Sequence, residues 1–108
     1  MTNSRTVVSY RVHPGRGDEN EALVRAVFEE LHRTRPAGID YATIRLEDGV
    51  SFLHVAAEGS GEVLRGLDAF QAFQAGVPER AEAPPEFASA TLIGEYRALS
   101  ALQPVTAS

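Results

Sequence analysis

The sequence predicts an α+β domain whose elements follow the order strand, helix, strand, strand, helix, strand. Three observations lead to this prediction. Alternating segments resembling strands stand near both ends, two segments repeat their apolar residues at helical spacing, and a hairpin pattern centred on Asp48-Gly49 lies between the helical segments. With 108 residues, the chain has the length of one domain.

The first strand is expected at residues 6–12 (TVVSYRV), where β-branched and aromatic residues alternate at a period of two. One face would carry Val8, Tyr10 and Val12, and the other Val7, Ser9 and Arg11. The segment His13-Pro14-Gly15 ends the strand, because proline lacks a ladder donor and glycine permits a turn.

The first helix is expected from Asp18, as the N-cap of an acidic capping box with Glu21, to the stop at Pro36 and Gly38. Its apolar residues recur at intervals of three and four and therefore form one stripe. They are Leu23, Val24, Val27, Phe28 and Leu31.

The hairpin is expected at residues 39–58, with Asp48-Gly49 as the central pair of a primed two-residue turn and Glu47 opposite Val50. This register separates two faces. The apolar face would hold Ala42, Ile44, Leu46, Leu53, Val55 and Ala57. The mixed face would hold Tyr41, Thr43, Arg45, Phe52, His54 and Ala56.

The remaining elements complete the order. Residues 59–61 form a link, residues 62–75 a helix weakened by Gly66, residues 76–86 a loop or broken helix, and residues 87–96 a last strand. Residues 1–97 would then be one ferredoxin-like split-βαβ domain, followed by a tail at 98–108. Right-handed crossovers place both helices on the same face of a four-stranded antiparallel sheet.

Composition excludes several classes of function. The net charge of −5 argues against nucleic acid or an anionic membrane as a partner. The absence of cysteine excludes disulfides and thiolate chemistry. The sequence contains no histidine–carboxylate motif of the kind that binds metals, so we expect no metal site. Because the N-terminus lacks an apolar core of signal-peptide length, we expect a cytoplasmic protein.

Two helices can cover only one face of the sheet, and the apolar hairpin face with Val8, Tyr10 and Val12 is the natural choice. The mixed face would then remain open, together with Val7, Ser9 and Arg11. An exposed face with aromatic residues usually marks an interface or a ligand site. We therefore expect a homodimer formed through the non-helical sheet face, around a small cavity.

The chain resembles the dimeric α+β barrel proteins related to antibiotic biosynthesis monooxygenases. The resemblance covers residues 5–97 and rests on the strand that runs into Arg11-Val12-His13-Pro14-Gly15, the acidic start of the first helix, the Asp-Gly hairpin, the helix with Phe70 and Phe73, and the closing segment LIGEYR (92–97). These features are structural. The resemblance implies a dimeric barrel and, among the activities in the family, oxidation of a phenol or quinol without a cofactor.

The family that the chain resembles also includes haem-degrading enzymes, but the residues of this sequence disfavour that activity. That branch has an axial histidine on the second helix, an asparagine on the first strand and a tryptophan in the sheet. This sequence has no histidine at 62–75, has Ser9 at the strand position, and contains no tryptophan.

Candidate site residues come from the mixed face and the second helix. His54 is a candidate base toward a phenolic proton, with a satisfied interface histidine as the alternative. Arg11 and Arg45 would hold an anionic oxygen or form ion pairs between subunits. The remaining substrate-binding candidates are Ser9, Tyr41, Thr43, Phe52, Phe70 and Phe73, whose aromatic members would otherwise be core. Two alternative functions remain open. The protein would be a small-molecule-binding module without catalysis, or the mixed face would serve only for dimerisation.

Overall fold

The computed structural model describes residues 3–96; the expected tail at 98–108 and position 97 lie outside the described residues. Within them, the chain forms four strands and four helices in the order β1 (Ser4–Arg11), α1 (Gly17–Thr34), β2 (Tyr41–Arg45), β3 (Ser51–Ala57), α2 (Ser60–Arg65), α3 (Asp68–Ala75), α4 (Val77–Arg80) and β4 (Glu86–Thr91).

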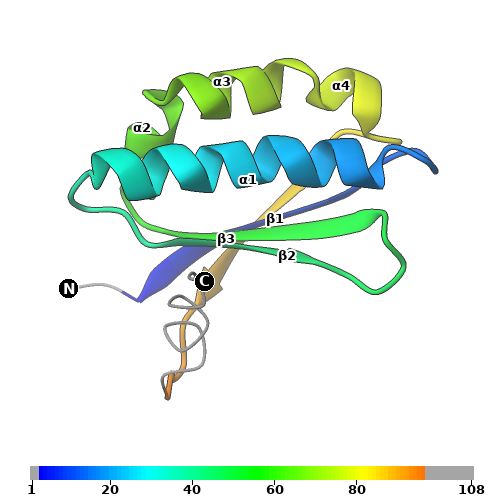
Figure 1. Cartoon of the computed structure of the whole chain (residues 1–108). Coiled ribbons are helices and arrows are strands. Elements are labelled where there is room, and N and C mark those ends of the chain that lie inside the picture. Colours follow the sequence, from blue (N-terminus) through cyan, green and yellow to red (C-terminus); the bar gives the residue numbers. More distant parts are fainter. Residues whose placement is uncertain (1–2, 97–108) are drawn as a thin grey trace.

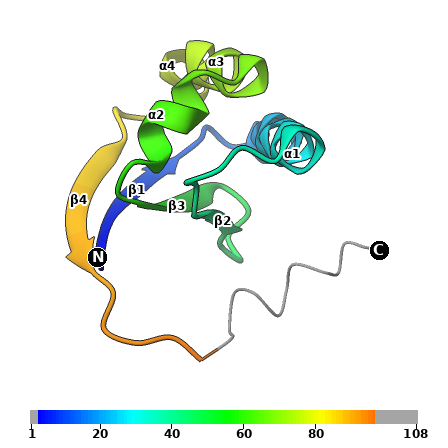
Figure 2. The ribbon, with the colours of Figure 1, turned by 90° about the vertical axis from the view of Figure 1, so that its left-hand side faces the viewer.

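The strands form one antiparallel sheet in the order β2-β3-β1-β4, and all helices lie on one side of it (Figure 1). Seen from the end, α1 covers the β2–β3 half, while β4 lies at the outer edge of the sheet (Figure 2). This confirms the predicted ferredoxin-like α+β fold, with long crossovers that carry the helices between strands that are not neighbours.

The predicted hairpin register is confirmed, whereas the turn differs. Ala42 pairs with Val55, and Ile44 with Leu53. The Leu46 amide donates to the Ser51 carbonyl at 2.9 Å, so the loop contains residues 47–50 instead of a two-residue turn. The Asp48 carboxylate accepts from the Val50 and Ser51 amides, which stabilises this wider loop.

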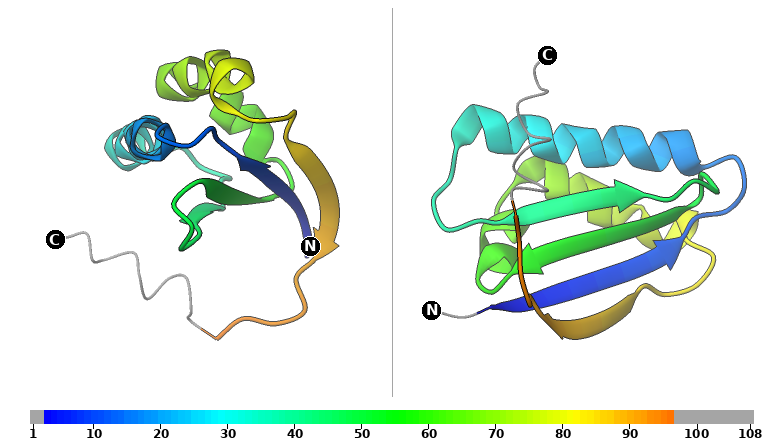
Figure 3. Two further views of the ribbon diagram at one scale, coloured as in Figure 1. Left: turned by 90° about the vertical axis from the view of Figure 1, so that its right-hand side faces the viewer. Right: turned by 90° about the horizontal axis from the view of Figure 1, so that it is seen from below.

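The predicted assignment of the hairpin faces is wrong. Val8 pairs with His54 and Tyr10 with Phe52, so the mixed face lies on the helix side together with Val8, Tyr10 and Val12. The open face, seen from below in Figure 3, belongs to the apolar set. Its members are Ala42, Ile44, Leu46, Leu53, Val55 and Ala57, with Val7, Ser9 and Arg11 from β1.

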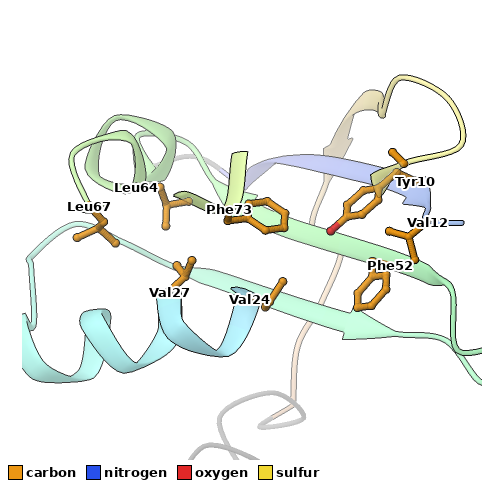
Figure 4. Close-up of a cluster of buried hydrophobic side chains, with 9 residues drawn as sticks. Tyr10, Val12, Val24, Val27, Phe52, Leu64, Leu67 and Phe73 are labelled. Atoms are coloured by element: carbon orange, nitrogen blue, oxygen red, sulfur yellow. The ribbon is translucent and has the colours of Figure 1, made fainter. Parts of the chain in front are cut away.

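Aromatic packing explains this choice of face. Phe52 is 1% exposed, whereas Ile44 on the open face is 42% exposed. The rings of Tyr10 and Phe52 stack with centroids 5.7 Å apart, and they gather with Phe73 between the helices and the sheet (Figure 4). A buried aromatic ring removes far more apolar surface from water than an alanine or valine does, so the face with rings gains more from the helices.

The helices depart from the prediction at their ends. Helix α1 begins at Gly17 after Arg16, and no side chain caps it, so the Asp18 capping box is wrong. The predicted helix at 62–75 is broken into α2 and α3 at Gly66-Leu67, and a further turn, α4, forms within the expected loop. Strand β4 ends at Thr91, earlier than predicted.

A Gly17→Ala substitution should lower the free energy of unfolding by about 1–3 kcal/mol, as overpacking does. A methyl group at Gly17 would overlap the Gly49 carbonyl and the Arg45 guanidinium, where the hairpin loop packs on the start of α1. Gly66→Ala is the control, since its added carbon would lie 3.5 Å from the Val63 carbonyl oxygen, an ordinary contact. Urea unfolding measures both, and equal stabilities would contradict this packing.

Candidate functional site

A chain of hydrogen bonds runs through the interior between α4, α1 and the sheet. Arg80 Nε donates to Asn20 Oδ1 at 3.0 Å, and Asn20 Nδ2 donates to Tyr10 Oη at 2.9 Å. Tyr10 Oη lies 2.9 Å from His54 Nε2, and the other ring nitrogen of His54, Nδ1, lies 2.6 Å from Tyr41 Oη. The hydrogen-bond chain thus links five elements, α4, α1, β1, β3 and β2, through polar groups that would be costly to bury without partners.

Thr43, which lies on β2 like Tyr41, joins this hydrogen-bond chain because its Oγ1 lies 3.1 Å from His54 Nδ1. Both ring nitrogens of His54 therefore have hydroxyl partners, and none of its polar capacity is left unmet. The imidazole is 6% exposed. It is held by the sheet register, which places Thr43 directly opposite His54 and Val8 on its other side.

Burial controls the ionisation of this chain. Desolvation lowers the pKa of His54 to about 4, so the imidazole is neutral at physiological pH. Desolvation also raises the pKa of Tyr10 to about 12, against the opposing hydrogen bond from Asn20. The pKa of Tyr41 is raised by burial as well, and the Thr43 hydroxyl opposes that shift by hydrogen bonding.

Aromatic rings surround His54. The Tyr10 ring stacks on the imidazole with centroids 5.4 Å apart, and the Phe73 ring approaches it at 5.5 Å. Tyr41 in turn stacks on Phe28 of α1, with centroids 5.2 Å apart. The imidazole is thus part of an aromatic cluster that excludes water, which accounts for its lowered pKa.

A cavity of about 230 Å³ lies beside this cluster, between α1 and the β2–β3 hairpin. Its walls are Glu21, Val24, Arg25, Phe28, Thr43, Arg45 and Phe52. The volume suits a single aromatic ring, since sites for larger ligands start at roughly 300 Å³. Thr43 belongs both to this wall and to the hydrogen-bond chain, so it connects the cavity to His54.

Arg45 is one of three charged residues in the cavity wall, with Glu21 and Arg25, and its ion-pair partners lie within the same chain. Its Nη1 contacts Glu21 at 2.6 Å and Asp18 at 3.1 Å, while its Nη2 donates to the Gly49 carbonyl at 2.8 Å. These contacts join the hairpin loop to the start of α1 and orient the guanidinium at the cavity.

Ser9 and Arg11 lie elsewhere. Both are on the open face, where a second hollow of about 370 Å³ is lined by Ser9, Tyr10, Arg11, Leu46, Ser51, Phe52, Leu53, Glu82, Ala83, Pro84 and Glu86. Arg11 Nε is 3.6 Å from a Glu82 carboxylate oxygen. The sheet therefore separates these two candidates from His54.

The structure brings together most of the other predicted site residues. Tyr41, Thr43 and Phe73 contact His54, while Arg45 and Phe52 line the adjacent cavity. Phe70 packs on Phe73, with ring centroids 6.0 Å apart, and so lies one ring further out. The expected location of all these mixed-face residues in a cavity between two subunits is wrong, because they lie beneath the helices of their own chain.

Sequence reasoning missed Asn20, Tyr10 and Arg80 as site residues. Asn20 did leave a signal, because it stands four residues before Val24 and seven before Val27, on the apolar stripe of the helix. A polar residue at such a position needs a buried partner. Arg80 left no comparable signal in its proline-rich surroundings.

Two kinds of feature are absent from residues 3–96, the part of the chain that the structure describes. No group of three or more potential ligand side chains is arranged there for a metal ion. No helix in this part of the chain is long and apolar enough to cross a membrane, and the cytoplasmic location stays a prediction.

Comparison with solved structures relates this fold to a class of proteins. A provisionally named antibiotic biosynthesis monooxygenase from Nitrosomonas europaea matches with a TM-score of 0.69 and 11% identity, covering 86% of this chain and 93% of that one. A protein with the same provisional name from Bacteroides thetaiotaomicron matches with a TM-score of 0.67 and 18% identity, covering 86% and 91%. A conserved protein from Methanosarcina mazei matches with a TM-score of 0.65 and 20% identity, covering 84% and 93%.

These matches confirm the predicted resemblance to antibiotic biosynthesis monooxygenase-like proteins at the level of the fold. At such identities, they carry no activity or substrate over to this chain. No protein-family model matches the sequence, and no curated protein matches it.

The buried imidazole should make stability depend on pH. His54 has a pKa of about 4 in the folded state against 6.5 ordinarily, so the unfolded chain binds the additional proton as the pH falls. Stability is therefore highest above pH 6.5 on this account and declines below it, by about 2 kcal/mol at pH 5. Urea unfolding of wild type and His54→Gln at each pH isolates this contribution. If the two proteins show parallel pH profiles, His54 does not have the lowered pKa.

Proposed function

We propose that this protein oxidises a small phenol or quinol with molecular oxygen, without a bound cofactor, in the cavity between α1 and the hairpin. The observation that carries the proposal is Thr43, which lines this cavity and hydrogen-bonds the buried imidazole of His54. The resemblance to monooxygenase-like proteins supports the choice of reaction. The aromatic walls Phe28 and Phe52 support the choice of substrate.

The ionised form of the substrate is the species that reacts with oxygen. A phenol that enters the cavity releases its proton to solvent at the open mouth and leaves a phenolate oxygen near Thr43. The Thr43 hydroxyl donates a hydrogen bond to that oxygen, and the Arg45 guanidinium adds positive charge to the same wall. Both effects stabilise the anion.

The oxidation draws all its electrons from the substrate. The phenolate passes one electron to oxygen, and the two radicals combine to form a carbon–oxygen bond at the para carbon. In a quinol, whose para carbon bears a hydroxyl, the bond forms at an ortho carbon instead. The resulting peroxide anion takes a proton from solvent and then loses the proton of that ring carbon while its oxygen–oxygen bond breaks, and the second oxygen atom leaves as water. The products are a quinone and water, so a phenol and one oxygen molecule balance without an added reductant.

In this scheme, His54 acts through Thr43 and Tyr41 instead of touching the substrate. Both of its nitrogens are occupied by protein hydroxyls, and it is absent from the cavity wall. Its role as the base that removes the phenolic proton stays a prediction. The geometry favours a role in which the imidazole orients the hydroxyls of β2.

Oxygen uptake tests the oxidation. Wild type should consume oxygen with members of a panel of phenols and hydroquinones. Thr43→Val should reduce kcat/KM by about tenfold to a hundredfold, because a donor to a charged oxygen is lost. Thr91→Val on β4 removes an exposed hydroxyl away from the cavity and should leave the rate unchanged. An absence of turnover across the panel, or identical rates in Thr43→Val and wild type, would exclude the mechanism.

Binding without catalysis is the second candidate function, and it is favoured because His54, with both ring nitrogens occupied by hydroxyls, is not placed to accept a proton from a ligand. An imidazole with a pKa of about 4 is a weak base toward a phenol. Thermal shift under nitrogen with the same panel separates the two functions. Stabilisation by a phenol that causes no oxygen uptake in air would support a binding module.

We also propose that two copies of the chain pair through the open sheet face. The face is apolar along β2 and β3, and Ile44 and Leu46 remain 42% and 43% exposed in a single chain. Exposed apolar sheet surfaces of this kind usually lie against a partner. Two-fold pairing would cover the face in both copies at once and also close the hollow beside Ser9 and Arg11.

Light scattering tests the pairing. Wild type should have the mass of a dimer at micromolar concentration, and Leu53→Glu, which places a charge at the centre of the open face, should have the mass of a monomer. Phe87→Glu is the matched control, because Phe87 is 72% exposed on the other side of the sheet, beside Val8. A wild-type monomer, or a dimer in Leu53→Glu, would contradict the proposed interface.

A further inference from the structure

Arg80 and Asn20 form the deep end of the hydrogen-bond chain, away from the cavity. Arg80 is 2% exposed and Asn20 is fully buried. The Arg80 guanidinium also donates to the Phe73 carbonyl at 2.9 Å and lies over the Phe73 ring at 5.3 Å. Because Gly76 has no side chain, this guanidinium can lie against the backbone there. A buried cation with this many specific contacts is expected to have a role besides packing.

The chemistry of the guanidinium fixes the orientation of Asn20. Arginine can only donate hydrogen bonds, so the atom of Asn20 that faces Arg80 must be the carbonyl oxygen. The amide nitrogen of Asn20 then faces Tyr10 and donates to its oxygen. The hydroxyl proton of Tyr10 is therefore directed to its other partner, His54 Nε2.

This direction determines where the neutral imidazole holds its proton. Since Nε2 accepts from Tyr10, the proton of His54 resides on Nδ1 and is donated to Tyr41 Oη, 2.6 Å away. The opposite arrangement would make Tyr10 Oη accept from both Asn20 and His54. The Tyr10 proton would then lack an acceptor among the contacts of this buried oxygen, at a cost of about 1–3 kcal/mol.

The outer end of the hydrogen-bond chain, at Tyr41 and Thr43, is compatible with a proton on Nδ1 of His54. Tyr41 is half-buried, so its hydroxyl proton can turn toward the Thr43 oxygen, which lies at the same ring nitrogen of His54. Thr43 can then donate into the cavity whose wall it forms. Each group thus donates a hydrogen bond to the next, from Arg80 at the inner end of the hydrogen-bond chain to Thr43 at its outer end.

We propose that Arg80 and Asn20 are positioning residues that direct hydrogen-bond donation outward through Tyr10 and His54, so that the imidazole holds its proton on Nδ1 and the cavity receives a donor at Thr43. The inference about the ligand, which rests on the proposed function, follows from this direction. The cavity selects a ring that bears an accepting oxygen, either a phenolate or a quinone carbonyl, over a ring that bears only a donor.

Nitrogen NMR of the imidazoles tests the direction of donation without any substrate. In wild type labelled with ¹⁵N-histidine, His54 should be a neutral ring with its proton on Nδ1 and a hydrogen-bonded, unprotonated Nε2. His54→Gln assigns its signals, and the exposed His13 and His32 serve as internal references. A proton on Nε2 of His54 in wild type, or a mixture of both tautomers, would overturn the proposal.

Asn20→Asp provides the sharper test, because it retains the shape of the side chain and its contact with Arg80. A carboxylate only accepts, so Tyr10 must now donate to it and can no longer donate to His54. The proton of His54 should move to Nε2 in this variant. A folded Asn20→Asp protein that retains the proton on Nδ1 would contradict the role of Asn20; if the variant does not fold, the wild-type spectrum still decides.

The NMR result and the oxygen-uptake result can fail independently. The expected tautomers without turnover would leave the positioning role intact and remove the oxidation. Turnover with the proton of wild-type His54 on Nε2 would support the oxidation and remove the positioning role. Tighter binding of benzoquinone than of benzylammonium, a ring compound that bears only a donor, measured by thermal shift, would support the inferred ligand class, and equal binding would remove it.

Discussion

The fold depends on the position of one imidazole between two tyrosine hydroxyls. His54 is buried on the helix side of the sheet, with Tyr10 on one nitrogen and Tyr41 on the other. An unpaired imidazole at this depth would cost several kcal/mol, so the strands must keep a register that brings both hydroxyls to it. Strand β1 supplies one hydroxyl and β2 the other, on either side of β3. The polar contacts thus align the three strands that also carry the aromatic core.

The two faces of the sheet have separate roles on this account. The helix side holds rings and satisfied polar groups, and it borders a cavity that a single aromatic ring could fill. The open side holds small and branched apolar residues along β2 and β3, which a second copy of the chain could cover. Ligand and partner would therefore be separated by the sheet. A substitution such as Leu53→Glu should affect assembly without touching the cavity, which makes the two proposals independent.

Local patterns predicted the elements, the fold class and the hairpin register, because strand alternation and helical periodicity are properties of short segments. The hairpin pairs Ala42–Val55 and Ile44–Leu53 followed from the position of Asp48-Gly49 alone. The pairing of β1 with β3 could not be obtained in this way, since no turn links these strands. A one-residue change in that register exchanges the faces, and the choice depended on burial of the aromatic rings together with partners for His54, both of which exist only in the fold. For the same reason, the site lies beneath the helices, and its members Asn20 and Arg80 were missed.

The central claim is that the ring-bearing face and its cavity form the ligand site. Amide chemical shifts during an anaerobic titration with hydroquinone test it most directly. If hydroquinone binds in the cavity, the perturbed amides should cluster at its wall, on Val24 and Phe28 of α1 and on Thr43 of β2, and the shifts should saturate. Perturbations confined to the open face, around Ser9, Leu53 and Glu82, would contradict it and assign the ligand to the opposite side of the sheet.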